Sequence, residues 1–152
     1  MNRVRVIVLG NRHAGDDGAA LRAAEILDGA LDRARVICAG RPGAGLLDLL
    51  EGKAPVVLVD VTRSGSAPGT IHRILLAELT EAALAGPNVS SHGFGPGQAL
   101  QLGRVLGRPV PDGSFVGVEG ACFDPGEDLS PEVAAAMPAL VAAVREAITA
   151  LE

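Results

Sequence analysis

The sequence predicts an α/β protein built on a parallel sheet. Two short runs, residues 4–9 and 56–60, are almost entirely apolar or β-branched, which is typical of strands buried on both faces of such a sheet. Hydrophobic residues make up 48% of the chain, with 20 Gly and 10 Pro, a composition that favours a compact α/β protein with many tight loops over a disordered chain.

The first half of the chain alternates strand and helix signals. Gly10 ends the first strand, and the acidic pair at 16–17 marks the start of the helix that follows it. A second, Gly/Pro-rich loop precedes a small leucine-rich helix. The expected elements are a strand at 4–9, a helix through 27, a strand at 35–39, a short helix at 46–50 and a strand at 56–60.

The second half of the chain adds two strands and two helical segments. Residues 70–75 are expected to form an edge strand with His72 facing solvent, and residues 115–119 form the last strand. One helix is expected at about 97–106. A C-terminal helix begins after Ser130 as N-cap, with Pro131 in its first turn. Pro138 is expected to kink or split that helix.

The loop after the first strand carries acids where a phosphate-binding loop would carry a cation. Gly10 and Gly15 have the spacing of GxxxxGK[ST], but Asp16 and Asp17 replace the Lys and the hydroxyl residue. The GxGxxG fingerprint also fails on spacing and charge. The loop therefore suits a cation. The alternative is that Asp16 caps the helix and Asp17 complements its dipole.

Composition excludes several classes of function. The 152 residues are expected to form one domain, residues 1–152. The net charge is −5 with no basic run, and the aromatic residues are three Phe without Tyr or Trp. These features argue against nucleic acid and anionic membrane as partners.

A cytoplasmic protein is expected from the cysteines and from the apolar segments. Cys38 and Cys122 make no CxxC motif and are expected to be two buried thiols in a reducing compartment. The apolar run at 4–9 is too short for the core of a signal peptide. No stretch is expected to reach the length of a membrane span.

Three side chains are expected to meet at one edge of the sheet. Asp17 and Asp60 follow two predicted strands, and His92 lies in a loop flanked by serines and a glycine. Two carboxylates about 4 Å apart repel by roughly 4 kcal/mol at an effective dielectric of 20. That repulsion is relieved either by a shared proton or by a divalent cation such as Zn, Ni or Mn with the imidazole as a further ligand.

Five blocks in order resemble the hydrogenase maturation endopeptidases. They are LGNxxxGDDG after the first strand, VVLVD with a later PGT, SSHG, GVE and LSPEV, and they cover nearly the whole chain. In that family the second acid of the DDG block, the acid ending VVLVD and the His of SSHG contact the metal. The resemblance therefore implies Asp17, Asp60 and His92 as the catalytic and metal-contacting residues.

The resemblance also implies a fold and an activity. The fold is a three-layer αβα sandwich with a mostly parallel, twisted sheet flanked by helices. The activity is that of a cytoplasmic endopeptidase that removes a C-terminal extension from the precursor of a nickel-iron hydrogenase large subunit. Nickel already inserted in that precursor comes with the substrate, so the isolated protein need not hold metal. A monomer is expected, with no nucleic-acid or membrane partner.

The chain departs from the family pattern at three places. Val8 replaces a glycine, residues 12–14 replace an apolar run, and residues 38–42 replace an acidic Asp-Gly-Gly-Thr-like stretch. His13 thus lies near the acids, either as a fourth ligand or as a solvent-facing loop residue. Two other functions stay open: a hydrogenase-assembly chaperone without catalysis, and a metal-dependent hydrolase of small amides or esters.

Overall fold

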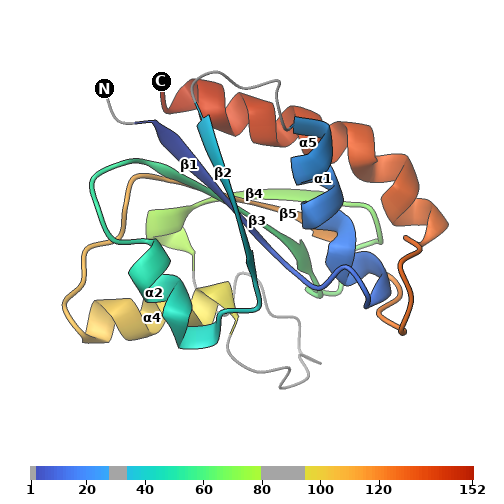
Figure 1. Ribbon diagram of the computed structural model, residues 1–152, viewed down its shortest axis with the longest axis horizontal. Coiled ribbons are helices and arrows are strands. Elements are labelled where there is room, and N and C mark those ends of the chain that lie inside the picture. Colours follow the sequence, from blue (N-terminus) through green and yellow to red (C-terminus); the bar gives the residue numbers. More distant parts are fainter. Residues whose placement is uncertain (1–2, 28–33, 80–94) are drawn as a thin grey trace.

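The computed structural model describes residues 3–27, 34–79 and 95–152, and a single five-stranded sheet runs through them. The strand order is β2-β1-β3-β5-β4, in which four strands are parallel and β4 is antiparallel to β5 at one edge (Figure 1). The strands are β1 (Val4–Leu9), β2 (Ala34–Gly40), β3 (Val56–Thr62), β4 (Ile71–Leu75) and β5 (Gly113–Glu119).

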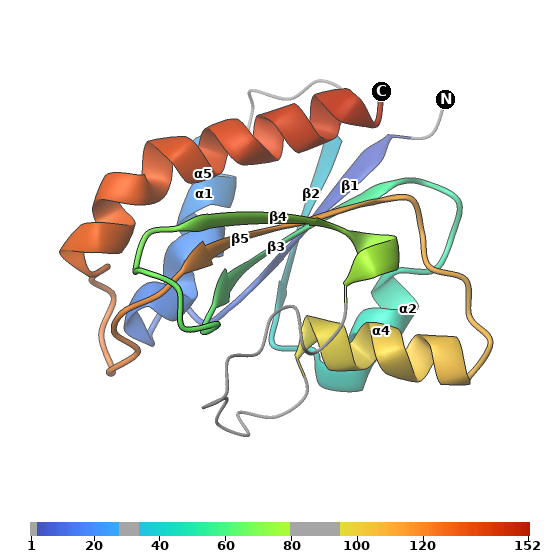
Figure 2. The same ribbon diagram turned by 180° about the vertical axis from the view of Figure 1, so that it is seen from behind.

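Helices cover both faces of the sheet, as Figures 1 and 2 show. α1 and α5 pack on one face, and α2 and α4 pack on the other. The bounds are α1 (Ala19–Leu27), α2 (Leu46–Leu49), α4 (Pro96–Val105) and α5 (Pro131–Ala150), with short 3-10 helices η1 (Gly15–Gly18), η2 (Gly43–Gly45) and η3 (Leu76–Glu78). The expected three-layer αβα architecture is confirmed.

β3 explains why the sheet holds two cores. All seven of its residues are buried. Val57, Val59 and Val61 join the core beneath α1 and α5. Val56 and Leu58 join the core beneath α2 and α4. Because side chains alternate along a strand, Asp60 and Thr62 lie on the α2 and α4 side of the sheet.

The strands and helices predicted within the described residues are all present, with small shifts of their ends. β3 continues two residues beyond the prediction, because Thr62 pairs with Glu119 of β5. The C-terminal helix does not split at Pro138, which lies inside one continuous helix of 20 residues. Pro138 is exposed, so the carbonyl that loses its N–H partner there can bind water.

Two expectations about exposure and length were wrong. Cys38 and Cys122 are both exposed free thiols instead of buried ones. α5 is long and apolar enough to cross a membrane, by length and composition only. One of its faces packs against the sheet and α1, and the core helix of a soluble protein meets the same criteria, so its length is weak evidence of a membrane span.

Candidate functional site

The carboxyl ends of β1, β2 and β3 lie side by side and bring three charged residues together. The strand order places β1 between β2 and β3. Asp17 follows β1, Arg41 follows β2, and Asp60 lies near the end of β3. The backbone N–H of Gly10, directly after β1, donates to the carbonyl of Gly40 at 2.9 Å. Arg41 is therefore held next to the loop that carries Asp17.

Asp17 is positioned by a turn that folds back on itself. Its Oδ2 accepts a hydrogen bond from the backbone N–H of Asn11 at 2.9 Å. The Asn11 side chain in turn accepts from the N–H of His13 at 2.9 Å, so Asn11 bonds within the turn. The side chain of Asp17 is 14% exposed, so it is only partly shielded from solvent.

Only glycine fits at position 10 of this turn. Gly10 has φ of +134°, and a Cβ added there would lie 2.0 Å from the carbonyl oxygen of Asp17. A backbone approach this close leaves no room for a side chain, and L-residues also avoid this φ. The glycine thus sets how near the Asp17 backbone comes to the end of β1.

Asp16 does not cap its helix, so the capping alternative offered by the sequence is wrong, but it does hold the loop. The N-cap of η1 is Ala14, which makes no side-chain cap bond. The fully buried Asp16 carboxylate instead accepts hydrogen bonds from the N–H groups of Ala121, Cys122 and Ser130, at 2.8, 2.9 and 2.7 Å, and from the Ser130 hydroxyl at 2.8 Å. It therefore fastens the loop after β5 to the loop after β1.

Hydrogen bonding keeps this buried carboxylate ionised. Burial acts to raise the pKa of Asp16, but the hydrogen bonds from Cys122, Ala121 and Ser130 outweigh it, so the pKa lies below its ordinary value. The same two loops are also joined through their backbones, since the N–H of Asp16 donates to the Cys122 carbonyl at 2.8 Å. The site thus rests on a fixed double loop.

Asp60 is the buried acid of the site. Its side chain is 4% exposed, and its Oδ1 accepts from the N–H of Val61 at 2.8 Å. The Arg41 guanidinium binds it through both oxygens, with Nη1 to Oδ2 at 2.9 Å and Nη2 to Oδ1 at 3.0 Å. Burial raises the pKa of Asp60, and the charge and hydrogen bonds of Arg41 oppose that rise.

Arg41 bridges the two acids. Besides its two bonds to Asp60, its Nη2 donates to Asp17 Oδ1, and its Nε lies 3.4 Å from Asp17 Oδ2. Burial alone would lower the pKa of Arg41, but the two carboxylates raise it above its ordinary value. The guanidinium is therefore the cation that offsets the repulsion between Asp17 and Asp60.

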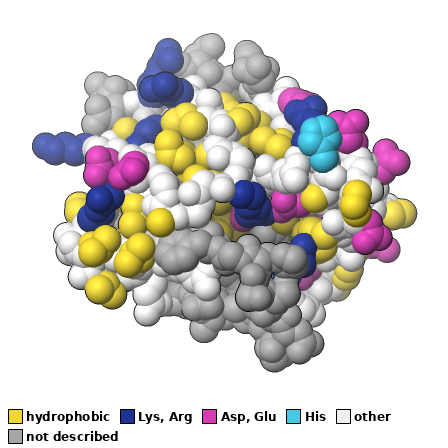
Figure 3. Space-filling view, turned by 60° about the horizontal axis from the view of Figure 1, so that its bottom comes forward, with side chains coloured by type: hydrophobic (Ala, Val, Ile, Leu, Met, Phe, Trp, Pro, Cys, Tyr) yellow, Lys and Arg dark blue, Asp and Glu magenta, His cyan; other side chains and the backbone are white. Residues whose placement is uncertain are grey.

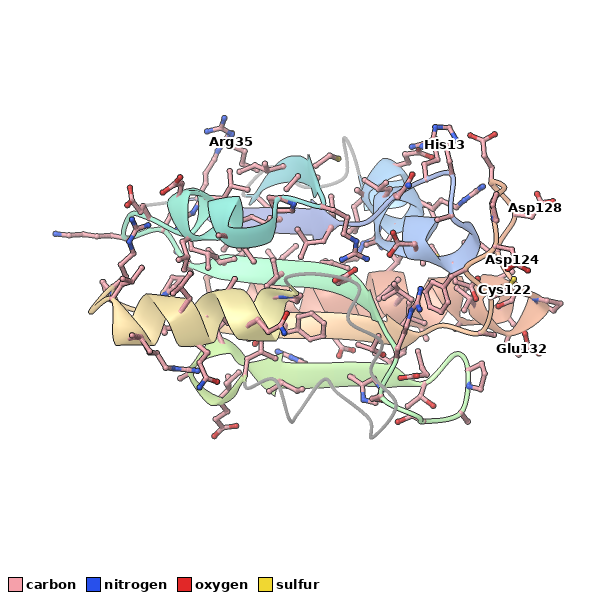
Figure 4. All side chains as sticks on the ribbon, turned by 90° about the horizontal axis from the view of Figure 1, so that it is seen from below. His13, Arg35, Cys122, Asp124, Asp128 and Glu132 are labelled. Atoms are coloured by element: carbon pink, nitrogen blue, oxygen red, sulfur yellow. The ribbon has the colours of Figure 1, made fainter. Side chains whose placement is uncertain are left out.

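His92 and His13 were the two histidines considered as metal ligands. His92 lies outside the described residues. The side chain of His13 is 74% exposed, and its Nδ1 lies 3.6 Å from a Glu127 carboxylate oxygen. Figure 4 shows His13 at the same end of the molecule as Asp128, Asp124 and Cys122. Figure 3 shows a histidine side chain at the surface, at the upper right of the view, with a basic side chain and acidic side chains near it. Of the two roles considered for His13, a fourth metal ligand or a solvent-facing loop residue, the structure therefore favours the second.

No group of three or more His, Cys, Asp or Glu side chains within the described ranges is placed to hold a metal ion. The structure brings together the carboxylates of Asp17 and Asp60, which both bind the guanidinium of Arg41. The arrangement can bind one positively charged centre between two neighbouring strand ends.

A second polar cluster adjoins the site at the ends of β3 and β5. Glu119, also buried, accepts from the Ser64 hydroxyl at 2.6 Å, the Thr62 hydroxyl at 2.8 Å and the Gly65 N–H at 3.2 Å. His72 is half-buried, with Nε2 3.4 Å from both Glu119 and Ser64, so the expectation that it faces solvent was wrong. Both partners meet the same imidazole nitrogen, which differs from a catalytic triad. The cluster anchors the loop after β3.

Sequence reasoning missed Arg41. It falls in the 38–42 segment that departs from the family pattern, and an arginine in a Gly/Pro-rich loop has no periodicity to mark it. The signal available was charge: two acids predicted at one edge require a nearby cation, and Arg41 is a basic residue that follows a strand of the same sheet.

The fold and the site define a class, namely an α/β protein with an acidic site at the carboxyl ends of its parallel strands. A model of the hydrogenase maturation protease family matches residues 21–147. The chain belongs to the hydrogenase maturation protease family. A search of curated proteins gave no significant match.

Solved structures of maturation proteases share this fold. The hydrogenase maturating endopeptidase HybD from E. coli is 26% identical with a TM-score of 0.74, covering 95% of this chain and 93% of that one. The [NiFe] hydrogenase maturation protease HybD from Thermococcus kodakarensis is 27% identical with a TM-score of 0.68, covering 95% and 97%. An endopeptidase from Escherichia coli, 23% identical, matches the fold with a TM-score of 0.81 over 97% and 93%.

Replacing Asp16 by Asn is expected to lower the free energy of unfolding by about 3 kcal/mol, because an amide NH₂ would face backbone donors and leave them unpaired. The pKa of Asp16 is lowered in the folded protein. Its contribution to stability is therefore present above the unfolded pKa of about 3.9 and is lost as pH falls through the folded value. Urea denaturation at several pH values should show the gap between wild type and Asp16→Asn narrowing in acid.

The exposed Asp128 supplies the control for this measurement. Asp128→Asn should change stability by less than about 0.5 kcal/mol and should keep the wild-type pH dependence. A gap between Asp16→Asn and wild type that stays constant across the acid range would contradict the role given to the Asp16 carboxylate.

Gly10→Ala is expected to destabilise the protein by about 1–3 kcal/mol more than Gly52→Ala. Both glycines have positive φ, +134° and +107°, but a Cβ on Gly52 meets nothing within 4 Å, whereas one on Gly10 meets the Asp17 carbonyl. The comparison by urea denaturation separates backbone strain, which the two variants share, from the clash. Equal losses would show that the close approach does not matter.

Proposed function

We propose that this chain is the endopeptidase that removes a C-terminal extension from the nickel-loaded precursor of a nickel-iron hydrogenase large subunit. Family membership supports the class of reaction and the kind of partner. The observation that carries the proposal for this chain is that Asp17, which follows β1, and Asp60, on the neighbouring β3, converge on a single cationic group. We further propose a cytoplasmic location and a monomeric protein.

In this proposal the nickel ion belongs to the substrate. Asp17 and Asp60 are the carboxylates that contact it, and His92 supplies an imidazole. Carboxylate and imidazole ligands suit Ni²⁺ and leave positions open for the peptide. The ion supplies Lewis-acid polarisation of the scissile carbonyl. This role is the family's, carried to these three residues by the sequence blocks that contain them.

The chain's own groups would orient the peptide and handle the proton. The carboxylate of Asp17, which is more exposed than that of Asp60 at 14% against 4%, is the group available to accept a proton from the attacking water. Asp60 is more deeply buried and is fixed by the Val61 N–H, which favours a positioning role for its carboxylate toward the ion. The difference in exposure between Asp17 and Asp60 is therefore the basis for giving them different roles.

One observation favours a second candidate, a chaperone that binds the precursor without cutting it. The segment that departs from the family pattern places Arg41 on both acids. If that pairing persisted with the precursor bound, the carboxylates would stay occupied and no hydrolysis would follow. A hydrolase of small substrates would instead turn over amides or esters without any precursor.

The test is incubation of the purified protein with nickel-loaded and nickel-free large-subunit precursor, followed by mass spectrometry of the precursor. We expect loss of a C-terminal fragment from the loaded form alone. Asp17→Asn and His92→Ala should slow cleavage by about 100-fold or more, since loss of even outer partners of a metal ligand costs 10- to 100-fold. Asp48→Asn, at an exposed acid on α2, should cleave normally.

Three results would contradict the proposal in different ways. Binding of the precursor without mass loss favours the chaperone. Cleavage of small esters or amides without precursor favours the general hydrolase. Normal cleavage by both Asp17→Asn and His92→Ala would leave an endopeptidase but overturn the assignment of its site.

A further inference from the structure

Arg41 occupies the place where a cation shared by Asp17 and Asp60 would sit. Three of its contacts with these carboxylates lie at 2.9, 3.0 and 3.4 Å, and the fourth joins Nη2 to Asp17 Oδ1. Both nitrogens of the guanidinium fork and its Nε are used. A free divalent ion cannot bind both carboxylates unless this fork leaves.

The arrangement differs from an ordinary surface ion pair. The Asp60 and Asp17 side chains are 4% and 14% exposed. By contrast, Arg108 also meets two carboxylates, Asp48 at 3.2 Å and Glu51 at 3.5 Å, but those side chains are 77% and 65% exposed. The two arginines are about equally exposed, at 43% and 40%, so the difference lies in the carboxylates. Water screens the exposed carboxylates of the second group more strongly than the largely buried carboxylates of the first.

From this geometry we infer that Arg41 is a specificity-determining residue, which keeps free divalent ions off the Asp17–Asp60 pair and yields only to an ion already fixed in a docked protein. The inference rests on the proposed function for the identity of that ion, nickel held by the precursor. The exclusion of free ions by Arg41 stands on the contacts alone.

The location of Arg41 allows it to leave. Its side chain is 43% exposed, and it lies in the loop between β2 and η2, outside the regular strand. Gly40, just before it, has a φ of +64°, and a Cβ there would meet nothing within 4 Å. The guanidinium can therefore turn into solvent by side-chain rotation, without disturbing a packed core.

Arg41 can select a docked ion over a free one because the two ions compete with it at different effective concentrations. A free ion must displace Arg41 at its bulk concentration. An ion held in a docked precursor acts at a high effective concentration, because the rest of the interface has already brought it to the site. If the site is free of Arg41 in about 1% of molecules, its apparent affinity for a free ion is reduced about 100-fold, while the docked ion still competes.

The experiment is titration of the purified, full-length protein with Ni²⁺ alone, by isothermal calorimetry in mildly alkaline buffer. Arg41→Ala should bind one Ni²⁺ about 100-fold more tightly than wild type, and Arg41→Gln, which keeps most of the stem, should show a similar gain. Arg41→Lys, which keeps the charge, should stay weak. The double variant Arg41→Ala/Asp60→Asn should lose the gain, which assigns it to this site.

Arg108→Ala is the matched control, since it frees two carboxylates at an exposed place; it should bind Ni²⁺ no better than wild type. Thermal denaturation with and without Ni²⁺ gives a second readout: the ion should raise the melting temperature of Arg41→Gln and leave that of wild type unchanged. The inference is overturned if wild type binds Ni²⁺ as tightly as Arg41→Ala and Arg41→Gln, or if Arg41→Lys gains as much as they do.

These outcomes are independent of cleavage. A protein that cuts no precursor but gains a Ni²⁺ site on loss of Arg41 would contradict the proposed function and leave this inference standing. A protein that cuts the loaded precursor, but whose Arg41 variants gain no Ni²⁺ site, would do the reverse.

Discussion

Two carboxylates held near each other at the carboxyl end of a parallel sheet impose the constraint on which the rest of the site depends. Asp60 is almost wholly buried, and burial of a charge is costly unless a partner and hydrogen bonds compensate it. Arg41 meets that need by binding both oxygens of Asp60 and reaching Asp17 with the same fork. The two acids and the arginine therefore form one electrostatic unit, in which no member can be changed alone without cost.

The loops around this unit are fixed by hydrogen bonds and by close backbone packing. Asp16 binds four donors of the loop after β5, and Gly10 admits the backbone of Asp17 at a distance no other residue permits. Loops commonly carry functional groups on a rigid scaffold. Here two neighbouring residues have different roles: Asp16 holds the loops together, and Asp17 faces the site.

Much of the fold could be predicted because its signals are local. The apolar runs of β1 and β3, and the Ser130-Pro131 start of α5, can be recognised without knowing what they contact. The pairing of Asp17 with Asp60 was also accessible, because carboxyl ends of parallel strands share one edge. The third expected member, His92, lies outside the described residues, so its place at that edge stays a prediction.

What could not be predicted depends on contacts between distant segments. Asp16 looked like a helix cap, since capping is the local option for an acid before a helix, but donors from residues 121–130 bind it instead. Arg41 had no pattern of its own, and its role appears only when the strand order sets β2 beside β1. Exposure of Cys38 and of Pro138 likewise depends on which face each segment turns to the core.

The measurement that tests the central claim most directly is a double-mutant cycle between Arg41 and Asp60, read as free energies of unfolding in urea. If the arginine is present to compensate a buried charge, Arg41→Ala leaves that charge unpaired, and adding Asp60→Asn should restore stability. The account predicts a coupling of about 1–3 kcal/mol, with the double variant more stable than Arg41→Ala alone. Additive losses, with the double variant the least stable of the four proteins, would contradict it.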